Sequence, residues 1–306
     1  MKKSISELNY SELLNYANNN YLSDSEKDEV VDSLINFRKY SEYNVYFFTI
    51  TWLNTNQREK LINSLLENCS EKVIYNFSVS LGNKLYESEV NYIFDKIYEF
   101  NDEDYVFMYI KEFFNVLKDN IDSIINKICK DSNYSLLFRV AKEYHESLES
   151  KIDYIASVIS KSQSGYYMNQ MLTYNISDSS KSLLLEEICK LDDDFILRDA
   201  ITYLKNNLSN NDINNILSSY DRTLKHKIIE SILENSITVL SEENITSIIN
   251  IVFKTLNKEN IIYVISKLYD YLTDEQIKLI IDLSEKTNNP EILFNVSELL
   301  KDKIVK

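Results

Sequence analysis

Apolar residues recur along the chain at the spacing that a helix needs to bury one face. An apolar residue at position i, with others at i+3 and i+4, places three side chains on the same side of a helix. Nine such triplets follow one another at intervals of 28 to 33 residues, and each predicts an amphipathic helix. The triplets are Val31, Leu34 and Ile35; Ile62, Leu65 and Leu66; Val90, Ile93 and Phe94; Ile121, Ile124 and Ile125; Ile152, Ile155 and Ala156; Leu185, Ile188 and Cys189; Ile213, Ile216 and Leu217; Ile245, Ile248 and Ile249; and Ile277, Ile280 and Ile281.

The interval between two triplets leaves room for one further helix and two turns. That helix is also amphipathic, as in Ile261, Ile262, Ile265 and Leu268. We name the first helix of each pair the A helix and the triplet-bearing helix the B helix. Pro290 begins a last A helix over residues 290–300, because proline is tolerated at the first helical position. We expect this helix to cap the stack.

Three segments near the C-terminus repeat one local pattern at intervals of 32 residues. Each carries a leucine, a Ser or Thr suited to cap a helix, a polar first turn and the first isoleucine of a triplet; they cover 208–213, 240–245 and 272–277. A helix pair of this length cannot bury its apolar face alone, so neighbouring pairs must stack. The sequence therefore predicts an all-α fold, a right-handed α-solenoid of about nine two-helix repeats of 31–32 residues. We expect one domain over residues 1–306, with 160–165 as the segment most open to bending.

This repeat is similar to the HEAT/armadillo class, and the similarity covers nearly the whole chain. The unit is shorter than the 34-residue tetratricopeptide repeat, whose Trp/Gly/Tyr signature is absent. The resemblance implies that the B helices line the concave surface of the stack. The B helices are therefore where we look for a binding surface.

Two rows of B-helix positions, i+1 and i+5, lie off the buried triplets. In the first five repeats they hold carboxylates, amides and one serine but no basic residue; the acids and amides are Asp32, Asn36, Asn63, Glu67, Asn91, Asp95, Asp122, Asn126 and Asp153. Carboxylates spaced along a groove create a negative field suited to a partner rich in Lys and Arg. The solvated face of any solenoid is also polar, so a purely structural interpretation stands beside this one. Tyr92 also lies off its triplet, and tyrosine is favoured at interfaces.

Charge and composition narrow the classes of function. The chain has 48 acidic and 33 basic residues, a net charge of −15, and only five arginines, so the basic footprint that nucleic acid requires is missing. Two glycines and one proline are too few for sheets or phosphate-binding loops, whereas asparagine can supply the left-handed helix ends. The acidic runs at 102–104 and 192–194 precede A helices and are expected to cap them.

No catalytic or metal-binding constellation stands out. His145 and His226 lie far apart without a ligand motif, so we expect no metal, no cofactor and no enzymatic activity. Cys69, Cys129 and Cys189 fall in apolar stretches and are expected to be buried free thiols in a reducing cytoplasm. No apolar run is long enough to span a membrane, and the N-terminus has no signal-peptide pattern.

These observations favour a cytoplasmic, non-enzymatic scaffold whose acidic concave face binds a basic protein or peptide, and neither nucleic acid nor membrane directly. A sharper alternative is an inhibitor or immunity-type protein that blocks the nucleic-acid site of a basic target, with carboxylates in place of phosphates. Another is a structural assembly component that binds through its ends or its A helices. A HEAT-like DNA glycosylase is disfavoured, because such enzymes have a basic groove with Trp and Asp, and Trp52 is the only tryptophan here. The oligomeric state stays open.

Overall fold

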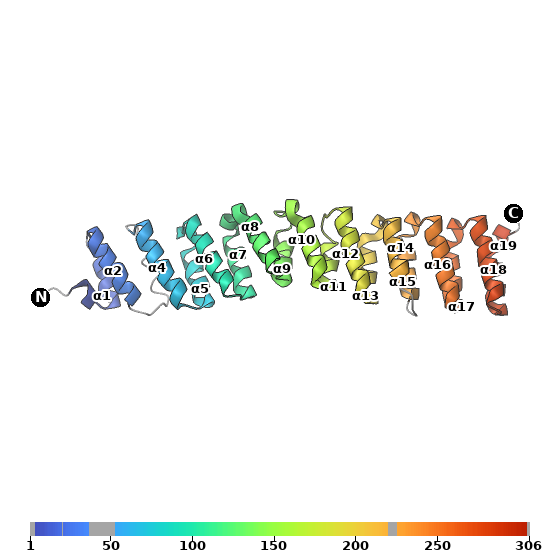
Figure 1. The fold of residues 1–306 in the computed structure, drawn as a ribbon, viewed down its shortest axis with the longest axis horizontal. Coiled ribbons are helices and arrows are strands. Elements are labelled where there is room, and N and C mark those ends of the chain that lie inside the picture. Colours follow the sequence, from blue (N-terminus) through green and yellow to red (C-terminus); the bar gives the residue numbers. More distant parts are fainter. Residues whose placement is uncertain (1–3, 20, 37–52, 220–224, 305–306) are drawn as a thin grey trace. The chain divides into compact units, whose positions relative to one another are not determined.

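A computed structural model describes residues 4–19, 21–36, 53–219 and 225–304, which fold into helices joined by short turns (Figure 1). No β-strand occurs in this part of the chain. The predicted all-α solenoid of helix pairs is therefore confirmed. The chain divides into two compact units, residues 1–139 and 140–306, and each unit is described by itself.

The N-terminal unit contains four of the predicted B helices, which are α2 (Asp24–Asn36), α4 (Thr55–Asn68), α6 (Glu87–Glu99) and α8 (Ile121–Lys130). Its A helices are α1 (Tyr10–Asn19), α5 (Glu71–Leu81), α7 (Glu103–Leu117) and the start of α9 (Tyr134–Tyr144). Short 3-10 turns occur at η1 (Ile5–Glu7), η2 (Gly82–Lys84) and η3 (Lys118–Asn120). The second predicted A helix and Trp52 lie outside the described residues.

The C-terminal unit contains the other five B helices, which are α10 (Ile152–Ile159), α12 (Asp178–Lys190), α14 (Asn210–Ser219), α16 (Glu242–Lys254) and α18 (Asp274–Lys286). Its A helices are α11 (Gly165–Met171), α13 (Asp194–Leu204), α15 (Lys225–Asn235), α17 (Lys258–Leu268) and α19 (Pro290–Ile304). The 3-10 turns are η4 (Glu149–Lys151), η5 (Ser160–Ser162), η6 (Lys205–Asn207), η7 (Ile237–Val239) and η8 (Tyr269–Tyr271). The last helix, α19, starts at the predicted proline and continues past residue 300.

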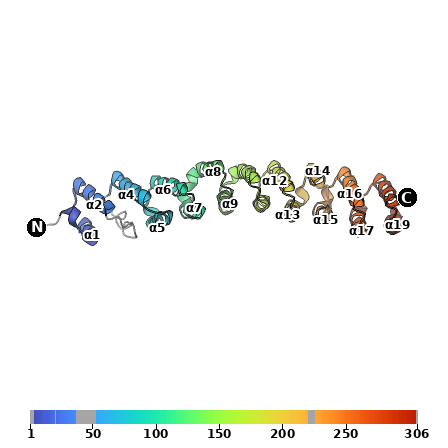
Figure 2. The same ribbon diagram turned by 60° about the horizontal axis from the view of Figure 1, so that its bottom comes forward.

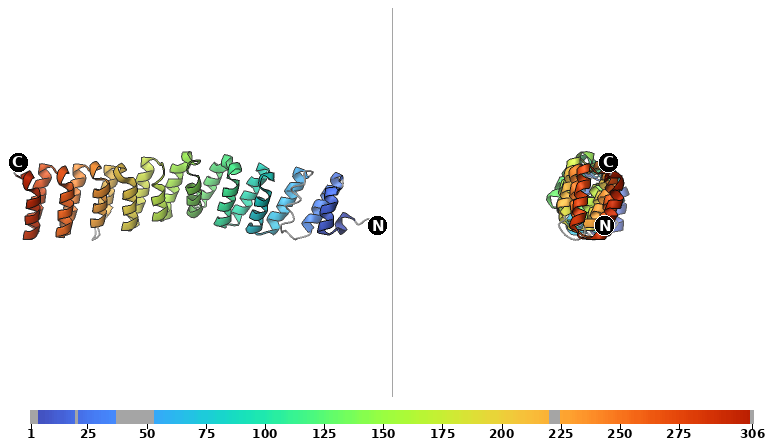
Figure 3. Two further views of the ribbon diagram at one scale, coloured as in Figure 1. Left: turned by 180° about the vertical axis from the view of Figure 1, so that it is seen from behind. Right: turned by 90° about the vertical axis from the view of Figure 1, so that its right-hand side faces the viewer.

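Each unit has two layers, one of B helices and one of A helices (Figure 2). A B helix packs on the B helix of the next repeat, as α4 does on α6 and α14 does on α16. An A helix does the same, as α5 on α7 and α15 on α17. Seen from behind, the helix pairs of each unit follow one another in chain order (Figure 3). Packing between repeats within a unit therefore joins residues that lie about one repeat apart in the chain.

The apolar triplets form the core between the two layers. All of them are buried except Ile35, Cys189 and Ile281, which are half-buried. The triplets therefore identified the buried face of every B helix correctly. Removing this apolar area from water, at about 25 cal/mol per Å², supplies the main stabilisation of each stack.

The turn from a B helix to the next A helix has a recurrent form. A residue with a positive φ ends the B helix, and the next residue caps the A helix, as in Asn101 (φ 59°) followed by Asp102. The Asp102 side chain accepts hydrogen bonds from the backbone N–H groups of Asp104 and Tyr105. Asp193 caps α13 in the same way. The capping role predicted for both acidic runs is confirmed.

Residues 160–165, where a bend was expected, form an ordered turn inside the C-terminal unit. Gln163 has a positive φ of 56°, Ser164 caps α11, and Gly165 is the first residue of that helix. A Cβ atom on Gly165 would lie 2.5 Å from Cγ2 of Ile196 on α13, so only glycine fits this close approach. The division between the two units falls between residues 139 and 140.

The three cysteines are all free, but their burial differs from the prediction. Cys129 is buried, whereas Cys69 and Cys189 are half-buried. Cys69 is less covered because it follows the last residue of α4 and does not lie within the helix. Even so, partial burial raises the pKa of the Cys69 thiol to about 11, so it stays protonated at neutral pH.

Candidate binding surface of the B helices

The predicted binding residues lie on five successive B helices, outside the buried core. Asn63 and Asn91 are half-buried and the other eight are exposed. Nine of them belong to the N-terminal unit: Asp32 and Asn36 on α2, Asn63 and Glu67 on α4, Asn91, Tyr92 and Asp95 on α6, and Asp122 and Asn126 on α8. The tenth, Asp153, lies on α10 in the C-terminal unit.

A hollow of about 430 Å³ opens between α4 and α6, and three predicted residues line it. The lining residues are Asn63, Leu66 and Glu67 from α4, with Tyr92, Lys96, Glu99 and the adjoining Phe100 from α6 and its end. We name it the α4–α6 hollow. Its two aromatic residues are exposed: Tyr92 is 39% exposed and Phe100 is 41% exposed.

Side-chain contacts fix one wall of the α4–α6 hollow. The Tyr92 hydroxyl donates a hydrogen bond to Oδ1 of Asn63 at 2.7 Å, which joins the two helices. Lys96 donates to Oε2 of Glu99 at 2.9 Å on the same helix, and this bond raises the pKa of the Lys96 ammonium. Glu67, on the opposite helix, has no ion-pair partner among the described residues. The α4–α6 hollow therefore combines exposed rings with an unmatched carboxylate.

Two of the other predicted carboxylates already have a lysine partner from the next B helix. Asp95 on α6 accepts a hydrogen bond from Lys127 on α8 at 2.9 Å, and Asp32 on α2 pairs with Lys60 on α4. These lysines occupy helix positions other than the two rows considered in the sequence. The face is therefore less negative than those two rows alone indicate.

The amides on this face contribute to the joints between repeats. Asn91 accepts a hydrogen bond at 3.1 Å from the side chain of Asn120, which precedes α8. The side chain of Asn91 also donates to the Glu87 carbonyl oxygen one turn earlier. Together with the Tyr92–Asn63 bond, this contact indicates that the half-buried asparagines hold neighbouring B helices in register.

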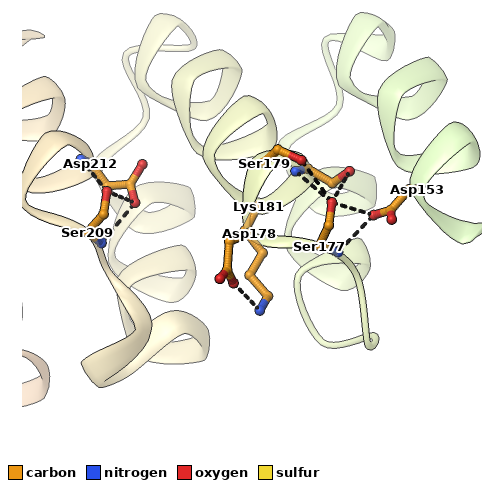
Figure 4. Close-up of polar contacts among 8 residues, drawn as sticks. Asp153, Ser177, Asp178, Ser179, Lys181, Ser209 and Asp212 are labelled. Atoms are coloured by element: carbon orange, nitrogen blue, oxygen red, sulfur yellow. Dashed lines mark hydrogen bonds and ion pairs between the residues drawn. The ribbon is translucent and has the colours of Figure 1, made fainter.

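Asp153 joins α10 to the start of α12 within the C-terminal unit (Figure 4). Its Oδ1 atom accepts hydrogen bonds from the Ser177 backbone N–H at 2.8 Å and from the Ser177 hydroxyl at 3.0 Å. The backbone bond, first among several causes, lowers the pKa of the Asp153 carboxyl. Much of its hydrogen-bonding capacity is thus used inside the fold.

Sequence reasoning missed the cluster around Arg58. This side chain is only 4% exposed and donates two hydrogen bonds to Glu89, from Nε and from one terminal nitrogen, both at 2.7 Å. It also donates to the Lys84 carbonyl oxygen at 3.0 Å and lies 4.4 Å from the centre of the Tyr86 ring. The sequence did contain a signal for this burial. Arg58 lies four residues before Ile62, and this spacing places it on the buried face of α4.

A second hollow, of about 220 Å³, lies in the C-terminal unit at the turn after α9. Its lining residues are His145, Glu146, Glu149, Ile152, Tyr174 and Asn175. The His145 ring stacks on Tyr174 with 5.0 Å between ring centres. Helix α9 ends at Tyr144, and His145 lies in the turn that follows.

Two further properties of the described residues bear on the chemistry available. They contain no group of three or more His, Cys, Asp or Glu side chains arranged to hold a metal ion. None of the helices in this part of the chain has the length and apolar character needed to cross a membrane.

Comparison with known proteins gives little. No family model matches the chain, and no curated protein matches it. Two solved structures show some likeness: a "circular tandem repeat protein with novel repeat topology and enhanced subunit contact surfaces" at 14% identity over 92% of this chain (TM-score 0.17), and one from the "computational design of self-assembling cyclic protein homooligomers" at 16% identity over 96% (TM-score 0.12). This chain spans 62% of the first protein's length and 90% of the second's. With TM-scores this low, the likeness carries no argument about function.

Proposed function

We propose that this chain is a HEAT-like, non-enzymatic scaffold whose B helices in the N-terminal unit bind a basic segment of another protein. The observation that carries the proposal is the α4–α6 hollow. It contains three residues that the sequence marked as a binding surface, and its exposed rings are flanked by carboxylates. Tyrosine at the centre of an interface is a frequent source of binding energy, because it buries a large area with little loss of side-chain entropy.

Charge favours a basic partner both during its approach and at the binding surface. Far from the surface, the net charge of −15 attracts a positively charged segment and speeds its encounter with the chain. Near the surface, Glu67 has no partner within the described chain, so an incoming cation need not break an existing ion pair. The three free cysteines are consistent with a reducing compartment such as the cytoplasm.

The inhibitor alternative receives less support from the same contacts. A phosphate mimic needs a row of carboxylates that are free to meet the target, whereas Asp32 and Asp95 are each held by a lysine of the next repeat. The proposal therefore centres on the α4–α6 hollow and not on the whole row.

Affinity purification of the tagged full chain from its native host tests the proposal. Glu67→Lys reverses the charge in the α4–α6 hollow, and Tyr92→Ala removes a ring; each should lower recovery of a basic partner about tenfold or more. Asp282→Lys, at the i+5 position of α18, is the matched control because it makes the same charge change on an exposed B-helix site elsewhere. The partner should leave as the salt concentration rises.

Three outcomes would overturn the proposal. If all three variants retain the same proteins as the unmodified chain, the α4–α6 hollow is not the binding site. Recovery of nucleic acid in place of a basic protein would contradict the interpretation of the charge. A partner that resists salt and ignores both hollow substitutions would favour the structural assembly role.

A further inference from the structure

One kind of side-chain contact joins repeats at several places in the N-terminal unit. A cation from one repeat lies over an aromatic ring of the neighbouring repeat and bonds a carboxylate of that same neighbouring repeat. Arg58 lies 4.4 Å from the Tyr86 ring centre and bonds Glu89. In the A layer, Arg139 lies 4.4 Å from the Phe107 ring centre and bonds Asp104.

The same kind of contact, with lysine as the cation, occurs between α6 and α8. Lys127 lies 4.5 Å from the Tyr98 ring centre and bonds Asp95. In all three cases the ring and the carboxylate are three residues apart on one repeat, so they lie on the same side of that segment. In this unit, three cations are therefore held between repeats by a ring and a carboxylate of the neighbouring repeat.

The α4–α6 hollow differs from these three joints in two ways: no cation is bonded to Glu67, and the rings of Tyr92 and Phe100 come from the repeat opposite the carboxylate. Lys96 follows the first residue of its triplet by six positions, as Lys127 does, and Glu67 corresponds in the same way to Asp95. By this register Lys96 would pair with Glu67. It bonds Glu99 on its own helix instead, which leaves Glu67 without an ion pair among the described residues and the Tyr92 and Phe100 rings open.

We propose that the α4–α6 hollow is an arginine-binding site, in which the guanidinium group of a partner lies against Tyr92 and Phe100 and bonds Glu67. A guanidinium stacks on rings and bonds carboxylates through two parallel donors, and it loses its hydration more readily than an ammonium group does. The volume of about 430 Å³ falls within the range of small-ligand pockets, about 300–1,000 Å³, and accommodates a side chain of this size.

This inference deepens the proposed function and rests on it for the use of the same hollow, but its test needs no partner. The probe is N-acetyl-arginine methylamide, titrated into the isotope-labelled full chain and followed by the shifts of backbone amide signals in NMR spectra. The lysine and citrulline analogues are the comparison ligands, because citrulline keeps the shape of arginine without its charge. We expect arginine to shift signals of 63–67 and 92–100, lysine to bind more weakly, and citrulline to cause no shift there.

Substitutions then separate what the carboxylate, the ring and the lysine each contribute to arginine binding. Glu67→Gln should weaken arginine binding about tenfold, or about 1.4 kcal/mol, because it replaces hydrogen bonds to a charged carboxylate with bonds to a neutral amide. Tyr92→Phe should keep most of the affinity and Tyr92→Leu should lose it, because the ring supplies the stacking. Lys96→Gln should strengthen binding, because it removes the competing cation. Glu87→Gln, on the same helix but outside the hollow, is the control and should change nothing.

The inference is wrong if arginine and citrulline shift the same signals equally, or if Glu67→Gln binds arginine as well as the unmodified chain does. If the probe fails in this way while Glu67→Lys and Tyr92→Ala still release a protein partner, the proposed function stands. The partner then enters the hollow with a group other than arginine. If the probe binds as expected and no basic partner depends on the hollow, the arginine site stands and the proposed function fails.

Discussion

Left-handed backbone positions in this fold are occupied mostly by residues other than glycine. The B-to-A turns place Asn101, Ser132, Asp192, Leu256 and Asn288 at φ values between 51° and 59°. Asparagine and aspartate tolerate this conformation because their short polar side chains bond locally. The sequence-based expectation that asparagine supplies helix ends is therefore confirmed at two of these turns, and Leu256 is the costliest exception.

Gly82 and Lys205 offer a direct test of backbone strain. Both follow an A helix and have nearly the same conformation, φ 51° and ψ −124° for Gly82 and φ 47° and ψ −128° for Lys205. Only glycine adopts this region without strain, so Lys205→Gly should raise the free energy of unfolding by about 1 kcal/mol. The Ser236 hydroxyl would keep its bond to the residue 205 carbonyl oxygen.

Gly82→Ala is the reverse change and should lower stability by about 1 kcal/mol. A Cβ atom there meets nothing within 4 Å, so only the backbone conformation is at issue. Urea unfolding followed by circular dichroism measures both variants. Loss of stability in Lys205→Gly, or none in Gly82→Ala, would show that the turn does not strain a side chain.

At the scale of the helix, the starts of the B helices α16 and α18 have a role that the sequence only half revealed. The Ser or Thr at the cap and the polar residue three positions later bond each other's backbone, as Ser241 and Asn244 do. The second residue is also buried and reaches the previous repeat: Asn244 donates to Asn214, and Gln276 donates to the Glu242 carbonyl oxygen. The capping motif therefore also ties neighbouring repeats together.

Arg58 and Glu89 form the strongest polar joint between α4 and α6. The guanidinium is almost fully buried and its bonds to Glu89 raise its pKa, so it remains charged at every relevant pH. Removing one partner leaves a buried charge without compensation, so Arg58→Met or Glu89→Leu should each cost about 3–5 kcal/mol.

The double variant Arg58→Met/Glu89→Leu should lose much less than the sum of the single losses, because neither charge is then left alone. Urea unfolding of the four proteins gives the coupling free energy. Additive losses would mean that the two residues stabilise α4 and α6 independently.

The sequence predicted the B helices better than the binding surface, and the difference has a physical cause. A buried stripe is set by apolar spacing alone, so Ile62 and Ile121 mark it without knowledge of the neighbours. Whether a carboxylate is free depends on which rotamer a lysine of the next repeat adopts. Lys127 reaches across to Asp95, whereas Lys96 turns back to Glu99, and nothing in the local sequence distinguishes these choices.

Across the molecule, each unit is held together by contacts between neighbouring repeats. The polar bonds described above between repeats join residues 24 to 35 positions apart, for example Ser177 with Asp153 and Arg139 with Asp104. Stability in such a stack is close to a sum of repeat terms and nearest-neighbour terms. A local defect should therefore weaken the repeats beside it and fade with distance along the chain.

Native-state hydrogen exchange tests this on the full chain. Arg58→Met breaks the joint between α4 and α6, so amide protection should fall in α4, α5 and α6 by several orders of magnitude more than in α16 to α18. Gln276→Leu is the reciprocal variant, because it removes bonds from α18 to Glu242 and Thr246 on α16. It should lower protection in α16 to α18 and leave α4 to α6 unchanged. An equal fall everywhere in either variant would mean that the chain unfolds as one cooperative body, and the nearest-neighbour description would then fail.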